Sequence, residues 1–167
     1  MNTHQEKVDN CEKRGRERTK LVLTLSFPYV DYSFYWTTGN NTTDLWMTGR
    51  TAKSLRTYVG DVKAYLDEKH PRDLFQYPDY MADYMKLREI VKKARNDKDK
   101  NRIPILIAVF PTYLAIWNLY EVDWEHTAEW RYVNKTGVNY GEKEWELMAY
   151  LKPEDAMIIN YNPDSIS

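Results

Sequence analysis

Residues 58–66 read YVGDVKAYL, and this stretch decides the fold. Its β-branched and aromatic residues predict a strand. Because side chains two residues apart on a strand point to the same face, we expect Asp61 and Lys63 to share a face with Val59 and Tyr65. Burying an acid and a base together is costly unless they are paired or bound to another group. The stretch therefore predicts a strand that carries a polar site on one face.

The composition is that of a soluble globular domain. The chain has 167 residues, enough for one domain with a core of useful size, and 43% of them are apolar. The aromatic content of 14% is high and suggests a broad sheet surface or an interaction face. No apolar run reaches the roughly 18 residues of a membrane span, and the polar first residues lack the apolar core of a signal peptide. The single Cys11 cannot form an internal disulfide, so we expect a cytoplasmic protein without membrane contact.

Charge is segregated along the chain, although the net charge is only −1. Residues 12–20 and 86–102 are basic, and acidic residues concentrate in the last third. Nucleic-acid-binding proteins are often basic overall, but a locally basic face also binds phosphates. Each basic run taken alone is more simply explained as a solvated helix face.

Hydrophobic periodicity predicts alternating helices and strands. The expected elements are a helix over 5–27, strands over 29–38, 43–49 and 55–66, a helix over 79–98, strands over 102–110 and 111–124, an edge strand over 145–151 and a short helix over 152–159. The second helix is expected to bury a stripe formed by Met81, Tyr84, Leu87, Val91 and Ala94. This order predicts an α/β fold with a mixed central β-sheet flanked by helices.

A second acidic residue, Asp44, stands at the start of the strand that precedes 55–66. If these two strands form a hairpin, Asp44 comes alongside Asp61 at one end of the sheet. Two carboxylates and the ammonium group of Lys63 make a hard-oxygen site, which suits Mg²⁺ or Mn²⁺. The histidines, which zinc would favour, are scattered and are expected at the surface. They are His4, His70 and His126.

The run of Asp44 and then Asp61-Val62-Lys63, followed by a helix and two strands, resembles the PD-(D/E)XK nuclease superfamily. This is the restriction-endonuclease-like fold, which includes Holliday junction resolvases. The resemblance covers roughly residues 8–124 in the order α-β-β-β-α-β-β, and it implies one nuclease-like domain over 1–167 with a small C-terminal extension over 125–167. It also implies that Asp44, Asp61 and the Val62 carbonyl hold the metal. Lys63 would orient the attacking water or stabilise charge on the phosphate.

A glutamate from the first helix often completes such a site, and the candidates are Glu17 and Glu12. Glu17 is favoured because Leu21 and Leu25 follow it at four-residue steps and are expected to seat that face on the sheet.

The second helix of such nucleases often contributes a polar residue. Here Lys86 is the natural candidate, and Tyr84 is the next one. The family's proline is replaced by Thr43, and the middle acid is Asp61 rather than a glutamate. Neither departure removes a ligand.

The resemblance implies a Mg²⁺- or Mn²⁺-dependent endonuclease that hydrolyses DNA phosphodiester bonds in resolvase-like or repair-type cleavage. Such small domains often come from phages or mobile elements, and many act as homodimers. One alternative is a catalytically silent accessory protein on the same fold, which binds a protein or nucleic-acid partner; the net charge of −1 and the aromatic surplus favour it. Another is a structural sheet domain in which Asp61 and Lys63 pair with neighbours. Residues 125–167 are expected to cap the sheet, pair two subunits or cover the cleft.

Overall fold

The computed structural model describes residues 3–37, 44–67, 69, 72–96, 102–134 and 141–166. These residues form the helices α1 (His4–Ser26) and α2 (Tyr84–Arg95). They also form β1 (Asp31–Trp36), β2 (Leu45–Arg50), β3 (Leu55–Ala64), β4 (Tyr80–Asp83), β5 (Arg102–Val109), β6 (Tyr113–Asn118), β7 (Glu129–Asn134), β8 (Lys143–Leu151) and β9 (Met157–Asn160). Three short 3₁₀ helices are η1 (Leu74–Gln76), η3 (Pro153–Asp155) and η4 (Pro163–Ser165).

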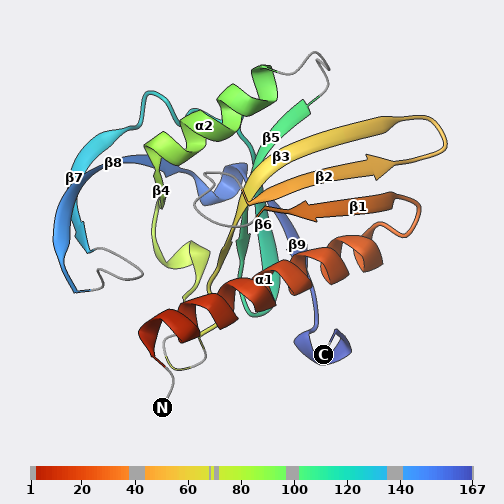
Figure 1. Cartoon of the computed structure of the whole chain (residues 1–167), viewed down its shortest axis with the longest axis horizontal. Coiled ribbons are helices and arrows are strands. Elements are labelled where there is room, and N and C mark those ends of the chain that lie inside the picture. The colour runs from red at the N-terminus through yellow and green to blue at the C-terminus, as the bar shows by residue number, and fades with distance from the viewer. Residues whose placement is uncertain are drawn as a thin grey trace.

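The strands form two sheets (Figure 1). A six-stranded sheet has the order β1-β2-β3-β5-β6-β9, and a three-stranded sheet has the order β4-β8-β7. Only β3 and β5 pair in parallel among the described pairs, so the larger sheet is mixed. The expected α/β fold with a mixed central sheet is confirmed.

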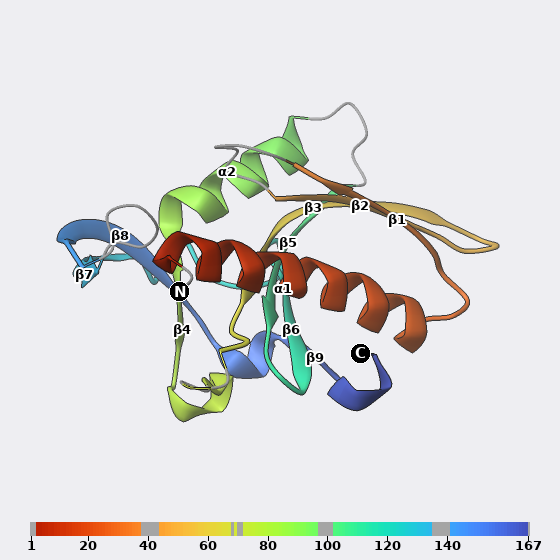
Figure 2. The same cartoon turned by 60° about the horizontal axis from the view of Figure 1, so that its bottom comes forward.

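The two helices cover opposite faces of the larger sheet (Figures 1 and 2). Along β5, Leu106 and Ala108 belong to the core under α2, whereas Ile105 and Ile107 belong to the core under α1. A strand that is buried on both faces has a nearly continuous apolar sequence, as β5 does. The Val59 side chain places the face of β3 that carries Asp61 on the α2 side.

α1 begins with a capping box, in which Thr3 and Glu6 exchange hydrogen bonds between side chain and backbone. Its buried face is formed by small residues in its middle, Gly15 and Thr19, and then by Val22 and Leu23. Leu21 and Leu25, which the sequence places on the sheet, are 41% and 61% exposed. The expected helix is confirmed, but its predicted packing face is wrong.

The second predicted helix starts later than expected. Residues 80–83 form β4, which pairs with β8, and Met81 is exposed rather than part of the buried stripe. The Asp83 side chain then accepts hydrogen bonds from the backbone N–H groups of Met85 and Lys86, which caps the helix. A long-range strand pairing and a local cap therefore override the helical periodicity of residues 79–83.

The C-terminal strands are integral parts of the two sheets. The segment expected as an edge strand is β8, the central strand of the smaller sheet, between β4 and β7. The expected helix over 152–159 is a single 3₁₀ turn that begins at Pro153, and the chain then pairs with β6 as β9. The Trp117 indole N–H donates to the Lys152 carbonyl (3.0 Å), which fastens this turn to β6. β9 therefore extends the larger sheet beyond β6.

No helix in the described part of the chain has the length and apolar character needed to span a membrane.

Candidate functional site

Two carboxylates meet where β2 begins. β2 and β3 pair with Leu45 opposite Gly60, so the same register brings Asp44 opposite Asp61. The backbone N–H of Asp44 donates to the Gly60 carbonyl (3.0 Å), which extends the pairing to this position. Gly60 is required because a Cβ atom there would lie 2.4 Å from the Ile105 carbonyl oxygen on β5. The predicted hairpin is present, and it places the two acids side by side.

The carboxylate of Asp61 is completely buried, with 0% exposure. The ammonium group of Lys86 lies 3.0 Å from its Oδ2 atom, and that of Lys63 lies 3.9 Å from the same atom. Apart from Asp44, no described residue gives either oxygen a partner with hydrogen-bond geometry. A buried carboxylate with incomplete hydrogen bonding is unfavourable for folding, and this is typical of a group that has a ligand to bind.

The two acids differ in their affinity for protons. Burial, together with a hydrogen bond with Asp44, raises the pKa of Asp61 to about 7. Burial also acts to raise the pKa of Asp44, but the hydrogen bond from Asp61 and the charges of Lys86, Lys63 and Arg16 outweigh it and lower this pKa. A hydrogen bond between two carboxyl groups requires a proton on one of them. As the pH falls, Asp61 is therefore the member of the pair that takes up a proton first.

Lys86 remains charged although it is largely enclosed. Burial lowers its pKa, but the carboxylate of Asp61, aided by Asp44, raises it by more. Lys86 is in the first turn of α2, where the Asp83 cap fixes the start of the helix. Lys86 therefore lies beside Asp61, and its role at a catalytic site stays a prediction.

α1 contributes Arg16 to the carboxylates, not Glu17. The Arg16 guanidinium lies 3.8 Å from Oδ1 of Asp44 and 5.4 Å from the centre of the Trp36 ring. The neighbouring Gly15 allows this approach, because a Cβ atom at Gly15 would lie 2.6 Å from the Cβ atom of Ala64 on β3. Sequence reasoning missed Arg16 because it chose the packing face of the helix from its leucines and did not use Gly15 as a sign of close approach to the sheet.

Glu17 and Glu12 are exposed on α1, and neither contributes to a group of three metal-ligating side chains among the described residues. On a helix one residue corresponds to a rotation of about 100°, which separates Glu17 from Arg16. The signal that indicates the correct face is the series of small residues at four-residue steps, Cys11, Gly15 and Thr19. Small residues let a helix approach its neighbour closely.

The remaining predicted residues have other surroundings. The Val62 side chain is buried in the core under α1, on the opposite face of β3 from Asp61, so its backbone carbonyl alone is a candidate ligand. Tyr84 packs its ring against Trp124, with ring centres 5.4 Å apart. Thr43 lies outside the described residues.

Asp44 and Asp61 are the residues that could hold a magnesium-type ion, although the described residues contain no group of three metal-ligating side chains. Mg²⁺ is usually held by one or two carboxylates, and waters and substrate phosphates complete its coordination. Asp44 and Asp61 provide two carboxylates, and the orphaned oxygens of Asp61 provide a reason for a cation to bind. Three positive side chains, Lys63, Lys86 and Arg16, surround these two acids. The site therefore suits a cation that binds together with an anionic phosphate.

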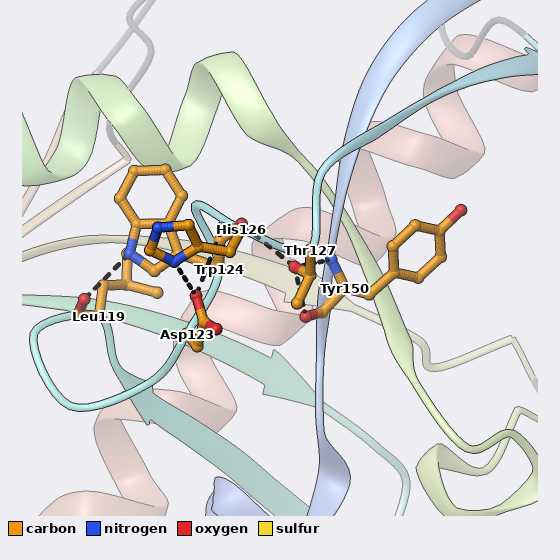
Figure 3. Close-up of polar contacts among 6 residues, drawn as sticks. All are labelled: Leu119, Asp123, Trp124, His126, Thr127 and Tyr150. Atoms are coloured by element: carbon orange, nitrogen blue, oxygen red, sulfur yellow. Dashed lines mark hydrogen bonds and ion pairs between the residues drawn. The ribbon is translucent and has the colours of Figure 1, made fainter.

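A separate surface hollow of about 210 Å³ is lined by Arg95 and the chain from 119 to 126. Figure 3 shows the polar contacts beside it. His126 pairs with Asp123 (2.9 Å) and is exposed, as expected for a surface histidine. His4 is also exposed, and His70 lies outside the described residues. None of these groups belongs to the carboxylate pair.

Comparisons with family models, with curated proteins and with solved structures give no match.

Proposed function

We propose that this protein is a metal-dependent nuclease that hydrolyses DNA phosphodiester bonds. The observation that carries the proposal is the buried Asp61 carboxylate, whose oxygens have no hydrogen-bond partner other than Asp44 and lie beside two ammonium groups. Burying a carboxylate in this way lowers the stability of the fold, and a purely structural role would provide no interaction that offsets this cost.

The order of elements supports a restriction-endonuclease-like core. A leading helix precedes three antiparallel strands, and α2 then connects them to β5, which pairs in parallel with β3. With β4 set aside, which lies between β3 and α2 and belongs to the smaller sheet, this order is the α-β-β-β-α-β-β order that the sequence resemblance implies. The acids lie at the start of β2 and inside β3, as the motif requires.

Each side chain has a distinct role in this proposal. Asp44 and Asp61 would hold Mg²⁺ or Mn²⁺, with help from the Val62 carbonyl. The bound ion would lower the pKa of the attacking water and offset charge on the phosphate. Lys63, with nearly half of its side chain exposed, is available to a substrate phosphate or to the attacking water. Lys86 holds a fixed positive charge beside Asp61.

A catalytically silent accessory protein is the second candidate. Three cations surround two acids, and the described residues contain no group of three metal-ligating side chains. Such a site could bind a phosphate without cleaving it. Titration calorimetry separates the two candidates, because the silent protein would bind a nucleic acid in the absence of any Mg²⁺ or Mn²⁺ binding.

The test of the nuclease is cleavage of plasmid, branched and single-stranded DNA in the presence of Mg²⁺ or Mn²⁺. Asp61→Asn keeps the shape of the side chain and removes its charge, and we expect it to lower the cleavage rate by about 1,000-fold. Asp155→Asn is the matched control, because Asp155 is exposed in η3. Equal cleavage by the wild type and Asp61→Asn would refute the proposal.

A further inference from the structure

Three aromatic side chains are exposed on a ribbon that projects from the body of the protein. Trp130 and Tyr132 on β7 and Trp145 on β8 are 64%, 57% and 66% exposed. Figures 1 and 2 both show the β7–β8 ribbon at the end of the molecule where α1 and α2 begin. Exposing the apolar surface of three large rings to water is unfavourable, so a cluster of this kind marks a binding surface.

The register places the three rings on one face of the ribbon. Tyr132 pairs with Trp145 and Trp130 pairs with Leu147, so these four side chains point the same way. The rings of Tyr132 and Trp145 are 5.5 Å apart, and the Lys143 ammonium group lies 5.9 Å from the centre of the Tyr132 ring. This aromatic face is therefore a row of rings with a cation at one end.

Charge is divided between the two faces of the ribbon. Within the described strands β7 and β8, the aromatic face carries Lys143 as its charged residue, beside Asn134 and Leu147. By strand alternation, the other charged residues of the exposed ribbon point to the opposite face. They are Glu129, Arg131, Glu144 and Glu146. Within the paired residues of β7 and β8 the aromatic face thus carries no acid, and it suits an anionic ligand with flat rings.

The ribbon is anchored next to the carboxylate site. The Thr127 hydroxyl bonds to the carbonyls of Trp124 (3.1 Å) and Tyr150 (3.0 Å), which holds the start of the ribbon to β8 (Figure 3). On its other side β8 pairs with β4, where Met148 lies opposite Asp83. Asp83 is the cap of α2, three residues before Lys86. The ribbon is therefore connected through β4 to the first turn of α2, which carries Lys86.

We propose that the aromatic face of the β7–β8 ribbon binds unpaired nucleotides of the DNA substrate by stacking their bases on Trp130, Tyr132 and Trp145. This inference rests on the proposed nuclease function and names the form of DNA that the protein prefers. Stacking requires bases that are already free, as in a single strand, a flap or a frayed end, because duplex bases stack on each other. Lys143 adds a phosphate contact at one end of the row.

The test measures the binding of labelled oligothymidylate, about 12 nucleotides long, by fluorescence anisotropy in EDTA, with a duplex of equal length for comparison. We expect single-stranded DNA to bind more tightly than duplex. Trp130→Ala and Trp145→Ala should each weaken its binding about tenfold, and Trp145→Phe should keep most of the affinity. Tyr35→Ala is the matched control, because Tyr35 is 72% exposed on β1, in the other sheet.

Two results would overturn the inference. One is that the ribbon variants bind oligothymidylate as tightly as Tyr35→Ala does. The other is that they change the oligomeric state in sedimentation experiments while the oligonucleotide affinity stays the same, because the ribbon would then be a contact between two copies of the chain.

The binding test and the cleavage test are independent, because binding in EDTA does not depend on cleavage. If the wild type cleaves DNA in an Asp61-dependent way and the ribbon variants bind normally, the ribbon inference fails alone. If ring-dependent binding is found without cleavage, the nuclease proposal fails alone.

Discussion

α1 and α2 pack on opposite faces of the same sheet, but they make these contacts with different residues. α2 buries large apolar side chains in one stripe, Leu87, Ile90 and Val91 among them. α1 makes its closest approach through Gly15 and Thr19 and buries larger residues only near its C-terminal end. Apolar periodicity therefore identifies the buried face of α2 and fails for α1.

The helices also differ in what they bring to the carboxylates. From α2, Lys86 lies 3.0 Å from Asp61, the acid with the raised pKa. From α1, Arg16 lies 3.8 Å from the ionised partner, Asp44, and both of these side chains contact solvent. Contacts between solvent-exposed charges are weak, so we assign most of the electrostatic control of the site to α2.

The largest expected effect tests the packing of α1. Leu23→Ala should lower the free energy of unfolding by about 2–5 kcal/mol, because this side chain is 3% exposed and its loss leaves a cavity. Leu25→Ala, two residues away and 61% exposed, should change it by less than about 0.5 kcal/mol. Urea denaturation of both variants gives the comparison. A large loss for Leu25→Ala would restore the helix face that the sequence predicted, and with it a place for Glu17 at the site.

The sequence was sufficient to predict the parts of the site that depend on local rules. Strand alternation placed Asp61 and Lys63 on one face, and the hairpin register brought Asp44 opposite Asp61. What the sequence did not predict depends on contacts between distant segments. β4 and β9 are short, and they form because β8 and β6 offer free edges for pairing. Arg16 reaches Asp44 because Gly15 allows a close approach, and a glycine leaves no hydrophobic signal.

The next effect concerns the cation on α2. Lys86→Met should lower the rate of DNA cleavage by about 100-fold, because it removes a fixed positive charge from the low-dielectric surroundings of Asp61. The matched control is Lys92→Met, since Lys92 is exposed on the same helix. Thermal unfolding of both variants separates a loss of function from a loss of folding. If both variants cleave DNA equally well, α2 supplies packing and no electrostatic control.

A smaller effect tests the close approach of α1. Gly15→Ala favours an isolated helix by about 1 kcal/mol, but here the new Cβ atom would lie 2.6 Å from the Cβ atom of Ala64. We expect a net loss of about 1–3 kcal/mol in the free energy of unfolding, measured in urea. The double variant Gly15→Ala with Ala64→Gly should recover part of this loss, because it removes the atom that clashes. A stabilised Gly15→Ala protein would mean that α1 does not approach β3 so closely.

The last prediction uses the difference in pKa between the two acids, which is raised for Asp61 and lowered for Asp44. Burial raises the pKa of Asp61 to about 7, so a metal ion must displace a proton at lower pH. Mn²⁺ affinity should therefore fall by up to about tenfold for each pH unit below 7 and level off above it. Titration calorimetry in buffers of different ionisation enthalpy should detect the released proton.

The raised pKa of Asp61 also makes the stability of the fold depend on pH. Because the folded protein binds this proton more tightly than the unfolded chain, the Asp61 contribution to stability is lost as the pH rises through about 7. Asp61→Asn should then exceed the wild type in melting temperature at high pH, and the difference should shrink in acid. A Mn²⁺ affinity that does not change across neutral pH would show that Asp61 is already ionised, and the contrast between the two carboxylates would be lost.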